Sequence, residues 1–238
     1  YKKLYYYYMT CFRCKSKDIN YLFNSKDYVT KKSFKIYRCN KCNIDFPIPR
    51  PTSLDKYYPK TYRKYNFIVN KVFNFFYKQK ADNIDNFFYN NKNKTLLEIG
   101  CGDGKLLNFF KKKGWKVFGT ERKVSLKKLK AKTLNISNKH LSKFPDKSFD
   151  LIMLNNSFEH LPDAHIIEKQ FNKKLKKNGL LVINIPSANS LQYKFGKGYW
   201  YHLDVPRHLQ IFDDRYFLNF SKKNGFKIIR KRSLGFFW

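Results

Sequence analysis

The feature that most constrains the fold is an apolar segment that runs into a glycine-rich turn. Residues 95–99 are mostly apolar, and glycines follow at alternate positions 100, 102 and 104. Glycine lets the backbone turn sharply and approach a ligand closely, and open parallel sheets bind ligands beyond the carboxyl ends of their strands. The segment therefore predicts a buried strand, a ligand-binding turn and a helix over residues 105–113.

Downstream, short apolar runs alternate with Lys-rich amphipathic stretches, a pattern typical of parallel sheets whose strands are joined by helices. We expect further strands over 116–120, 134–137, 149–154, 180–185 and 226–232. We expect further helices over 124–132, 164–177 and 213–224, with Asn178-Gly179 ending the second of these. The predicted architecture is a Rossmann-like, doubly wound, mostly parallel α/β sheet of seven strands, with an irregular stretch over 186–209 and the seventh strand beginning near Trp238.

Composition and charge narrow the function classes. The net charge of +33 raises nucleic-acid binding as a function. Only nine of the 50 basic residues are Arg, however, and lysine lacks the planar fork that favours phosphate and base recognition. A solvated Lys-rich surface is the simpler interpretation. No apolar run reaches the ~20 residues of a membrane helix, and we see no signal peptide, so a cytoplasmic protein without membrane insertion is expected.

Two acids flank the glycine turn. Glu98 lies two residues before the first glycine, and a carboxylate there would repel a pyrophosphate but attract an ammonium or sulfonium group. Glu121 follows the turn by about 20 residues, the separation at which ribose hydroxyls are usually held. The glycine spacing also differs from the dinucleotide fingerprint G-x-G-x-x-G. These residues indicate a cationic, ribose-bearing ligand.

Four motifs carry a resemblance to a known family. LEIGCGDG (97–104), GTE (119–121), FPDKSFDLI (144–152) and SFEHLPD (157–163) resemble, in this order and spacing, the class I S-adenosylmethionine-dependent methyltransferases. The resemblance covers about residues 93–232 and implies S-adenosylmethionine as cofactor. It places Glu98 and the glycine loop near the methionine moiety and Glu121 on the ribose. The cofactor-binding residues so expected are Glu98, Gly100, Cys101, Gly102, Gly104, Glu121, Asn138 and Asn155.

Asn138 is assigned to the cofactor site because this chain lacks an acid that the family usually has. Many relatives carry an acid after the third strand that holds the adenine amino group. This chain has no acid between Glu121 and Asp146, so Asn138 is expected to substitute. Cys101 is interpreted as a small residue of the glycine loop rather than a nucleophile.

Two matched cysteine pairs precede the methyltransferase motifs. Cys11-x-x-Cys14 and Cys39-x-x-Cys42 have the spacing of a tetrahedral Zn²⁺ site. Two disulfides or a redox centre are the alternatives, and the absence of a secretory signal disfavours disulfides. A closed Cys₄ site is structural, because it leaves no coordination position for substrate. We expect a zinc ribbon over 1–50, a Tyr/Phe-rich linker with a flanking helix over 51–92, and an S-adenosylmethionine-binding domain over 93–238.

The order of these segments refines the resemblance. A Cys₄ head, the segments 46–51 and 54–62 and then the methyltransferase motifs are similar to zinc-ribbon-bearing bacterial methyltransferases of surface-polysaccharide and sugar modification. A small-molecule acceptor, a sugar or nucleotide-sugar, is implied. A quinone- or phenol-type O-methyltransferase and a Lys-rich nucleic-acid-binding protein with a zinc ribbon remain alternatives. Within residues 67–89, an amphipathic helix is predicted, with Phe73, Phe76 and Phe87 in the core.

Two stretches offer catalytic groups. Methyl transfer to a hydroxyl needs a base near the proton. Glu159 and His160 follow the strand at 149–154, and Asp204, Arg207 and His208 lie in the stretch after the fifth strand. His208 is the first candidate base and His160 the second, with Glu159 orienting His160. Arg207 is expected to bind a phosphate or carboxylate with two parallel hydrogen bonds. Alternatively, Glu159 and His160 shape their turn, and an Arg207–Asp204 pair locks the stretch.

Overall fold

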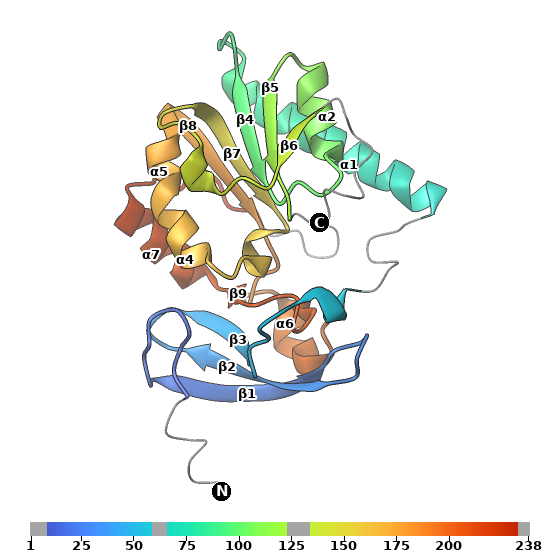
Figure 1. Ribbon diagram of the computed structural model, residues 1–238, viewed down its shortest axis with the longest axis vertical. Helices are drawn as coiled ribbons and strands as arrows, with labels where there is room; N and C mark the ends of the chain where they lie inside the picture. The colour runs from blue at the N-terminus through green and yellow to red at the C-terminus, as the bar shows by residue number, and fades with distance from the viewer. Residues whose placement is uncertain (1–8, 59–65, 123–133, 233–238) are drawn as a thin grey trace, which may run out of the picture. The chain divides into compact units, whose positions relative to one another are not determined.

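The strand and helix that flank the glycine turn form where the sequence predicts them. The computed structural model of the protein describes residues 9–58, 66–122 and 134–232. In it β4 covers Thr95–Ile99 and α2 covers Lys105–Lys112, with Gly104 in the left-handed conformation between them (Figure 1). An apolar run buried on both faces and a glycine at the helix start account for this segment.

The described residues form two compact units, each discontinuous in sequence. The first unit gathers residues from 1–62, 159–165 and 186–238, and the second gathers 63–158 and 166–185. The sequence-based domain boundaries at residues 50 and 92 remain predictions.

A parallel five-stranded sheet forms the centre of the second unit. Its strand order is β6-β5-β4-β7-β8, and every neighbouring pair is parallel. Six buried residues in succession, Phe149–Leu154, make β7 the most enclosed strand. The strands beside β4 are β5 (Lys116–Thr120), β6 (Asn135–Ser137), β7 (Phe149–Asn155) and β8 (Leu175–Asn184).

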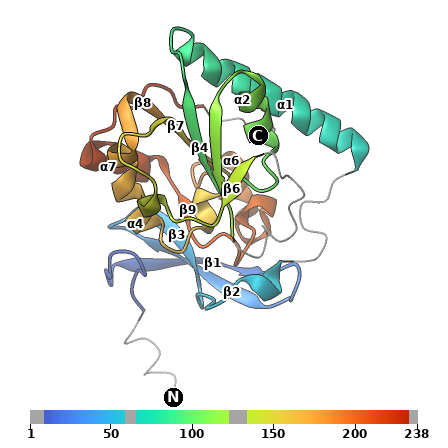
Figure 2. The ribbon, with the colours of Figure 1, turned by 45° about the horizontal axis from the view of Figure 1, so that its top comes forward.

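Helices α1 (Phe67–Asp85) and α2 pack together against this sheet, as both views show (Figure 2). The Asn66 side chain caps α1 by accepting a hydrogen bond from the Val69 amide at 2.9 Å. The prediction of Phe87 in the core is wrong, because its side chain is 49% exposed. The chain tightens into a 3₁₀ turn over Asn86–Phe88, which buries Phe88 instead. Phe73 and Phe76 are half-buried. The shared core consists of Ala81, Ile84, Phe88, Leu96, Leu106, Leu107, Phe110, Trp115, Val117, Leu151 and Met153.

The helix predicted over 164–177 is interrupted and shorter. The chain forms α4 (Ala164–Ile167), a 3₁₀ turn and α5 (Phe171–Lys174), and then enters β8. The expected end at Asn178-Gly179 is therefore wrong, since both residues lie inside a strand. Leu175 pairs with Phe149, and the register then shifts before Leu180. Tertiary pairing has overridden the local helix-ending signal.

The C-terminal elements agree in part with those predicted from the sequence. Helix α7 covers Asp214–Asn224, the Asp213 side chain caps it at the Tyr216 amide, and Gly225 ends it in the left-handed conformation. The strand predicted over 226–232 is wrong, since this segment has no strand structure and Ile228 and Ile229 are 46% and 58% exposed. The predicted seven-stranded sheet is thus not found within the described ranges, where the parallel sheet has five strands, and the helix predicted over 124–132 lies outside these ranges.

An antiparallel sheet of order β1-β2-β3-β9 organises the first unit. Strand β9 is only Ile211–Phe212, yet it pairs with β3 far earlier in the chain, Phe212 opposite Ile44. The stretch expected to be irregular over 186–209 contains α6 (Leu191–Gly196) and two 3₁₀ turns. The other strands are β1 (Ile19–Lys26), β2 (Ser33–Cys39) and β3 (Ile44–Ile48).

Residues from both ends of the chain build the core of this unit. The buried side chains are Phe34, Ile36, Tyr57, Ala188, Tyr193, Leu203, Val205 and Ile211. The stretch after β8 is therefore part of the packing around the N-terminal sheet. In neither unit do the described residues form a helix with the length and apolarity that crossing a membrane requires.

Candidate functional site

The glycine turn holds a backbone shape that only glycine adopts easily. Gly100 has a φ of +72°, its amide donates to the Thr120 carbonyl at 2.8 Å, and a Cβ there would lie 2.5 Å from Cβ of Ser157. Gly102 has a φ of +57° but open space where a Cβ would stand. The turn is thus closely packed at its first glycine and open at its second, where a ligand can approach the backbone.

Glu98 is a buried carboxylate at the foot of this turn. Its side chain is 2% exposed, and among the described residues no donor reaches its Oε2 within hydrogen-bonding distance. Burial raises the pKa of Glu98 to about 8, against the opposing effect of the Lys80 ammonium group. The negative charges of Asp103 and Glu121 contribute to this raised pKa. A buried acid with an open oxygen fits an arriving cationic group, such as the ammonium of S-adenosylmethionine.

Lys80 is a residue of this site that sequence reasoning missed. Its ammonium nitrogen donates to Oδ1 of Asn155 at 2.5 Å, and burial lowers its pKa to about 8, against the opposing charge of Glu98. The available signal was its position on α1, because Lys80 shares the inward face with Tyr77 and Ile84. A lysine on the apolar stripe of a helix indicates a buried charge with a role.

The other expected cofactor residues lie at the same sheet edge. Glu121 accepts hydrogen bonds from the Gly102 amide at 2.8 Å and the Arg122 amide at 2.9 Å, so it joins the end of β5 to the glycine turn. Asn155 ends β7, and Asn138 is exposed just after β6. Cys101 is buried, and burial raises the pKa of its thiol, which agrees with a packing role rather than a nucleophilic one.

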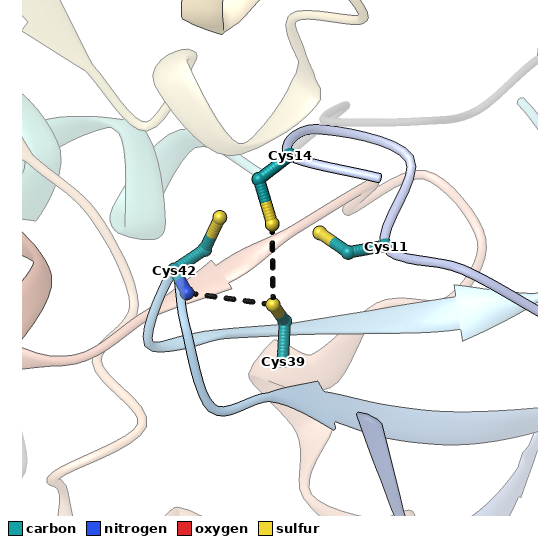
Figure 3. Close-up of side chains that lie close together, drawn as sticks. All are labelled: Cys11, Cys14, Cys39 and Cys42. Atoms are coloured by element: carbon teal, nitrogen blue, oxygen red, sulfur yellow. Dashed lines mark hydrogen bonds between the residues drawn. The ribbon is translucent and has the colours of Figure 1, made fainter. Parts of the chain in front are cut away.

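The four cysteines of the N-terminal pairs converge in the first unit. Their side chains point toward a common centre (Figure 3), and all four sulfur atoms lie within 4.8 Å of one another. The sulfurs of Cys14 and Cys39 are 3.6 Å apart, and the Cys42 amide donates to the Cys39 sulfur at 3.4 Å. A hydrogen bond from the Cys42 side chain lowers the pKa of the Cys11 thiol. This geometry fits a tetrahedral Zn²⁺ ion held by thiolates.

A second convergent group, here called the histidine cluster, consists of Glu159, His160 and His208. One potential ligand atom from each lies within 4.8 Å of the others. The two imidazole rings meet edge to face with centroids 4.5 Å apart, and Nε2 of His208 is 3.8 Å from Oε1 of Glu159. Glu159 and His208 are buried. The structure thus brings His208 beside Glu159 and His160, which precede it by 49 and 48 residues in the sequence.

Arg207 and Asp204 form a separate ion-pair network. The Arg207 side chain is fully buried and binds Asp204 at 2.8 Å and Asp27 at 2.8 Å. Its guanidinium also donates to the Tyr57 carbonyl and stacks over the Tyr28 ring at 4.2 Å. All three of its nitrogens face protein groups. This arrangement matches the alternative in which an Arg–Asp pair locks the stretch.

Comparison with known proteins places this chain among methyltransferases. A family model described as a methyltransferase domain matches residues 73–231. The chain belongs to this family. The match includes the glycine turn, Glu98, Glu121 and the histidine cluster, and it supports S-adenosylmethionine as the cofactor. The predicted zinc-ribbon subgroup lies beyond what the family model tests.

Individual relatives agree with this assignment. The chain is 30% identical over 112 residues to ubiquinone biosynthesis O-methyltransferase of Pelagibacter ubique, a match that spans 44% of this chain and only 47% of that protein. In fold it is similar to an S-adenosylmethionine-dependent methyltransferase of Archaeoglobus fulgidus, with a TM-score of 0.53, 23% identity and coverage of 65% and 69% of the two chains.

A similar comparison links it to an S-adenosylmethionine-dependent methyltransferase of Thermotoga maritima. There the TM-score is 0.50, the identity is 18%, and the match covers 68% of this chain and 74% of the other. At these identities the likeness concerns the fold alone, and it confirms the predicted α/β methyltransferase architecture around a parallel sheet.

Proposed function

We propose that the protein transfers a methyl group from S-adenosylmethionine to a small-molecule acceptor. The observation that carries the proposal is Glu98, a buried carboxylate with an open oxygen at the foot of the glycine turn. Folding a carboxylate into such a place is costly unless a cation or a proton accompanies it. A cofactor that brings an ammonium and a sulfonium group suits this position better than a dinucleotide, whose pyrophosphate would be repelled.

In this proposal the residues at the sheet edge bind different parts of the cofactor. Glu98 binds the amino group, and the open backbone at Gly102 faces the methionine portion. Glu121 accepts from the ribose hydroxyls, and Asn138 takes the position beside the adenine. Asn155, with Lys80 on its side-chain oxygen, completes the polar lining. The Cys₄ group holds a structural Zn²⁺ ion in the first unit.

We infer that the histidine cluster supplies the base. A carbonyl oxygen only accepts hydrogen bonds, so each imidazole that contacts one donates from Nδ1 and keeps the Nε2 lone pair. His208 is the first candidate and His160 the second, with Glu159 stabilising the protonated ring. His208 would take the hydroxyl proton as the acceptor oxygen bonds to the methyl carbon and the carbon–sulfur bond breaks. The sulfur keeps the electron pair, which leaves S-adenosylhomocysteine.

The chain path supports this role for the cluster. Glu159 follows Asn155, the last residue of β7, by four residues. Four residues span at most about 14 Å, even fully extended, so this short separation in sequence is compatible with Glu159 acting on a substrate of the second unit. Asp204 and Arg207 are proposed as positioning residues, because their charges are engaged with each other and with Asp27.

For the acceptor, a hydroxyl of a sugar or nucleotide-sugar is the first proposal. It rests on the resemblance of the Cys₄ head and the methyltransferase motifs to enzymes of sugar modification. A quinone- or phenol-type hydroxyl is the second candidate, favoured by the Pelagibacter relative. The family match favours both over a nucleic-acid-binding protein.

Calorimetric titration with S-adenosylmethionine and S-adenosylhomocysteine tests the cofactor proposal. We expect the wild type to bind both, and Glu98→Gln to weaken S-adenosylmethionine binding at least tenfold, since an ion pair in a partly buried cleft is lost. Asp103→Asn is the matched control, because it removes the same charge from an exposed position of the same loop. If the zinc-loaded wild type binds neither compound, the proposal is wrong.

The acceptor proposal is tested with methyl-labelled cofactor. Nucleotide-sugars and free sugars form one panel, and catechols and hydroquinones form the other. Label transfer to the first panel supports the sugar assignment, and transfer to the second alone supports the alternative. His208→Asn should lower turnover while cofactor affinity stays within about twofold, because its role begins with the acceptor proton.

A further inference from the structure

We propose that the histidine cluster is a binding site for a divalent transition-metal ion, separate from the Cys₄ group. The proposed ligands are Nε2 of His160, Nε2 of His208 and a carboxylate oxygen of Glu159, three side chains whose potential ligand atoms converge within 4.8 Å. The three side chains belong to the first unit, Glu159 and His160 at the end of a 3₁₀ turn and His208 in the segment that leads into β9. Metal binding at this place can be measured without turnover, so its test is independent of the proposed methyl transfer, in which the histidines serve as base only when no ion is bound.

The first argument is the orientation of both imidazoles. Nδ1 of His160 is 2.9 Å from the Arg207 carbonyl, and Nδ1 of His208 is 2.9 Å from the His202 carbonyl. Because a carbonyl oxygen only accepts, a neutral imidazole in either place carries its proton on Nδ1, which leaves Nε2 as the acceptor. Histidines that ligate metals almost always donate their other ring N–H to a carbonyl, carboxylate or water, which fixes the ring. Here two neighbouring histidines share that arrangement.

The second argument is distance. Two atoms that each bind one ion at about 2.1 Å can be at most about 4.2 Å apart. Nε2 of His208 and Oε1 of Glu159 are 3.8 Å apart, within that limit, and one potential ligand atom from each of the three side chains lies within 4.8 Å of the others. Side-chain rotation would be needed to bring all three to bonding distance of one ion.

The third argument is charge. Glu159 is buried, and Oδ2 of Asp204 lies a further 3.9 Å from Nε2 of His208. The nearby Arg207 guanidinium binds Asp204 and Asp27, so its single positive charge already faces two carboxylates. Two acceptor nitrogens beside a buried acid, in a surrounding that is negative on balance, favour a cation.

The ligand set indicates which ions fit. Imidazole with one carboxylate suits Zn²⁺, Fe²⁺, Co²⁺ and Mn²⁺, whereas Mg²⁺ and Ca²⁺ prefer oxygen ligands. Three protein ligands leave at least one coordination position open, as in catalytic rather than structural sites. An oxygen-bearing acceptor is the class of ligand that this open position would take. With the ion bound, both Nε2 lone pairs are used, so the histidines then act as ligands rather than as bases.

Cobalt titration of the intact, zinc-loaded protein tests the proposal. Because the Cys₄ group retains its zinc, the wild type should bind one further equivalent of Co²⁺ with the weak visible absorption of nitrogen and oxygen ligands and without thiolate-to-cobalt charge transfer. Mn²⁺ should selectively broaden the ring signals of His160 and His208 among the five histidines. No second equivalent, or a second equivalent with thiolate charge transfer, would overturn the proposal.

Variants locate the ion. Glu159→Gln and His208→Asn should each weaken the second equivalent by at least about tenfold, since even residues that only support metal ligands contribute 10- to 100-fold. His140→Asn is the control, because His140 is exposed and lies in the second unit. Retention of one zinc and an unchanged circular dichroism spectrum would show that each variant is folded. Unchanged Co²⁺ affinity in both folded variants would contradict the site.

Discussion

The ammonium nitrogen of Lys80 donates a hydrogen bond to Oδ1 of Asn155, the last residue of β7. Asn184 at the end of β8 donates to the same oxygen at 3.2 Å. The same lysine lowers the pKa of Glu98 against the stronger effect of burial. Helix α1 thus carries a positive charge to the carboxyl ends of the strands, where parallel sheets bind their ligands. Two predictions depend on this charge pair.

Cofactor binding should release a proton at pH 7. The pKa of Glu98 is raised to about 8 in the free protein, so the acid is mostly protonated at pH 7. An ammonium group bound beside it favours the carboxylate, and close to one proton should leave. Calorimetry in buffers of different ionisation enthalpy measures this number directly.

The comparison with Glu98→Gln assigns the proton. The arriving cation also disfavours the charged form of Lys80, whose pKa is lowered to about 8, so part of the release can come from that lysine. Glu98→Gln should remove most of the release, whereas Asp103→Asn should keep it. Equal release by wild type and Glu98→Gln would mean that Glu98 does not ionise on binding.

Removing either member of this pair should change stability with opposite pH dependence. Glu98 is raised above its unfolded pKa of 4.5, so its stabilising contribution is full below pH 4.5 and is lost as pH rises toward 8. Lys80 is lowered from 10.5, so stability is lost as pH falls from 10.5 toward 8. Relative to wild type, Glu98→Gln should therefore gain most above pH 8 and Lys80→Met most below it.

Denaturant unfolding of both variants at pH 5, 7 and 9 checks this pair of trends. Differences on the order of a few kcal/mol are expected, since each pKa unit corresponds to about 1.4 kcal/mol. Lys78→Met is a suitable control, because Lys78 is exposed and its partner Asp82 lies on the same helix. Parallel pH trends for the two buried-site variants would show that these groups do not hold the protonation states described.

Local sequence patterns predicted the parallel strands of the second unit well and the strand pairing of the first unit poorly, for a physical reason. Strands β4, β5 and β7 follow from continuous apolar runs, and the glycine turn follows from its residues, because such features act within a few positions. Strand β9 has two residues and exists only by pairing with β3. No local signal marks a strand of that length, so the contribution of residues 186–212 to the N-terminal sheet could not be predicted.

The same distinction explains the misplaced helix end. Lys174 ends α5 with its ammonium nitrogen on the Phe144 carbonyl at 2.6 Å and on Asp146 at 2.8 Å. These contacts join residues some 30 positions apart, and they hold the chain where Leu175 enters β8. Asn178-Gly179 retains a left-handed residue, Asn178 at a φ of +62°, but inside the strand. Within the site, the glycine turn and the histidine residues could be identified from the sequence, whereas Lys80 was identified only from the fold.

The Cys₄ group should be required for zinc content, and the fifth cysteine should not. Cys39→Ser removes a ligand at the end of β2 and should lower bound zinc well below one equivalent and destabilise the first unit, because metal binding and folding are coupled in such sites. Cys101→Ser is the matched control, since Cys101 lies in the glycine turn of the second unit. Elemental analysis and thermal melting measure both effects. Full zinc content in Cys39→Ser would contradict the assignment.

Arg207 should matter for folding more than for acceptor binding. Arg207→Met leaves Asp27 and Asp204 without their buried partner, and breaking a buried ion pair costs about 3–5 kcal/mol. Arg207→Lys should recover only part of this loss, because one ammonium group cannot reproduce the fork that binds Asp204, Asp27 and a carbonyl together. Arg215→Met, at a side chain 66% exposed, should change stability by less than about 0.5 kcal/mol. Denaturant unfolding gives the free energies of unfolding, and methyl-transfer kinetics give the second test. If Arg207→Met is as stable as wild type and has a raised KM for the acceptor, the guanidinium binds substrate.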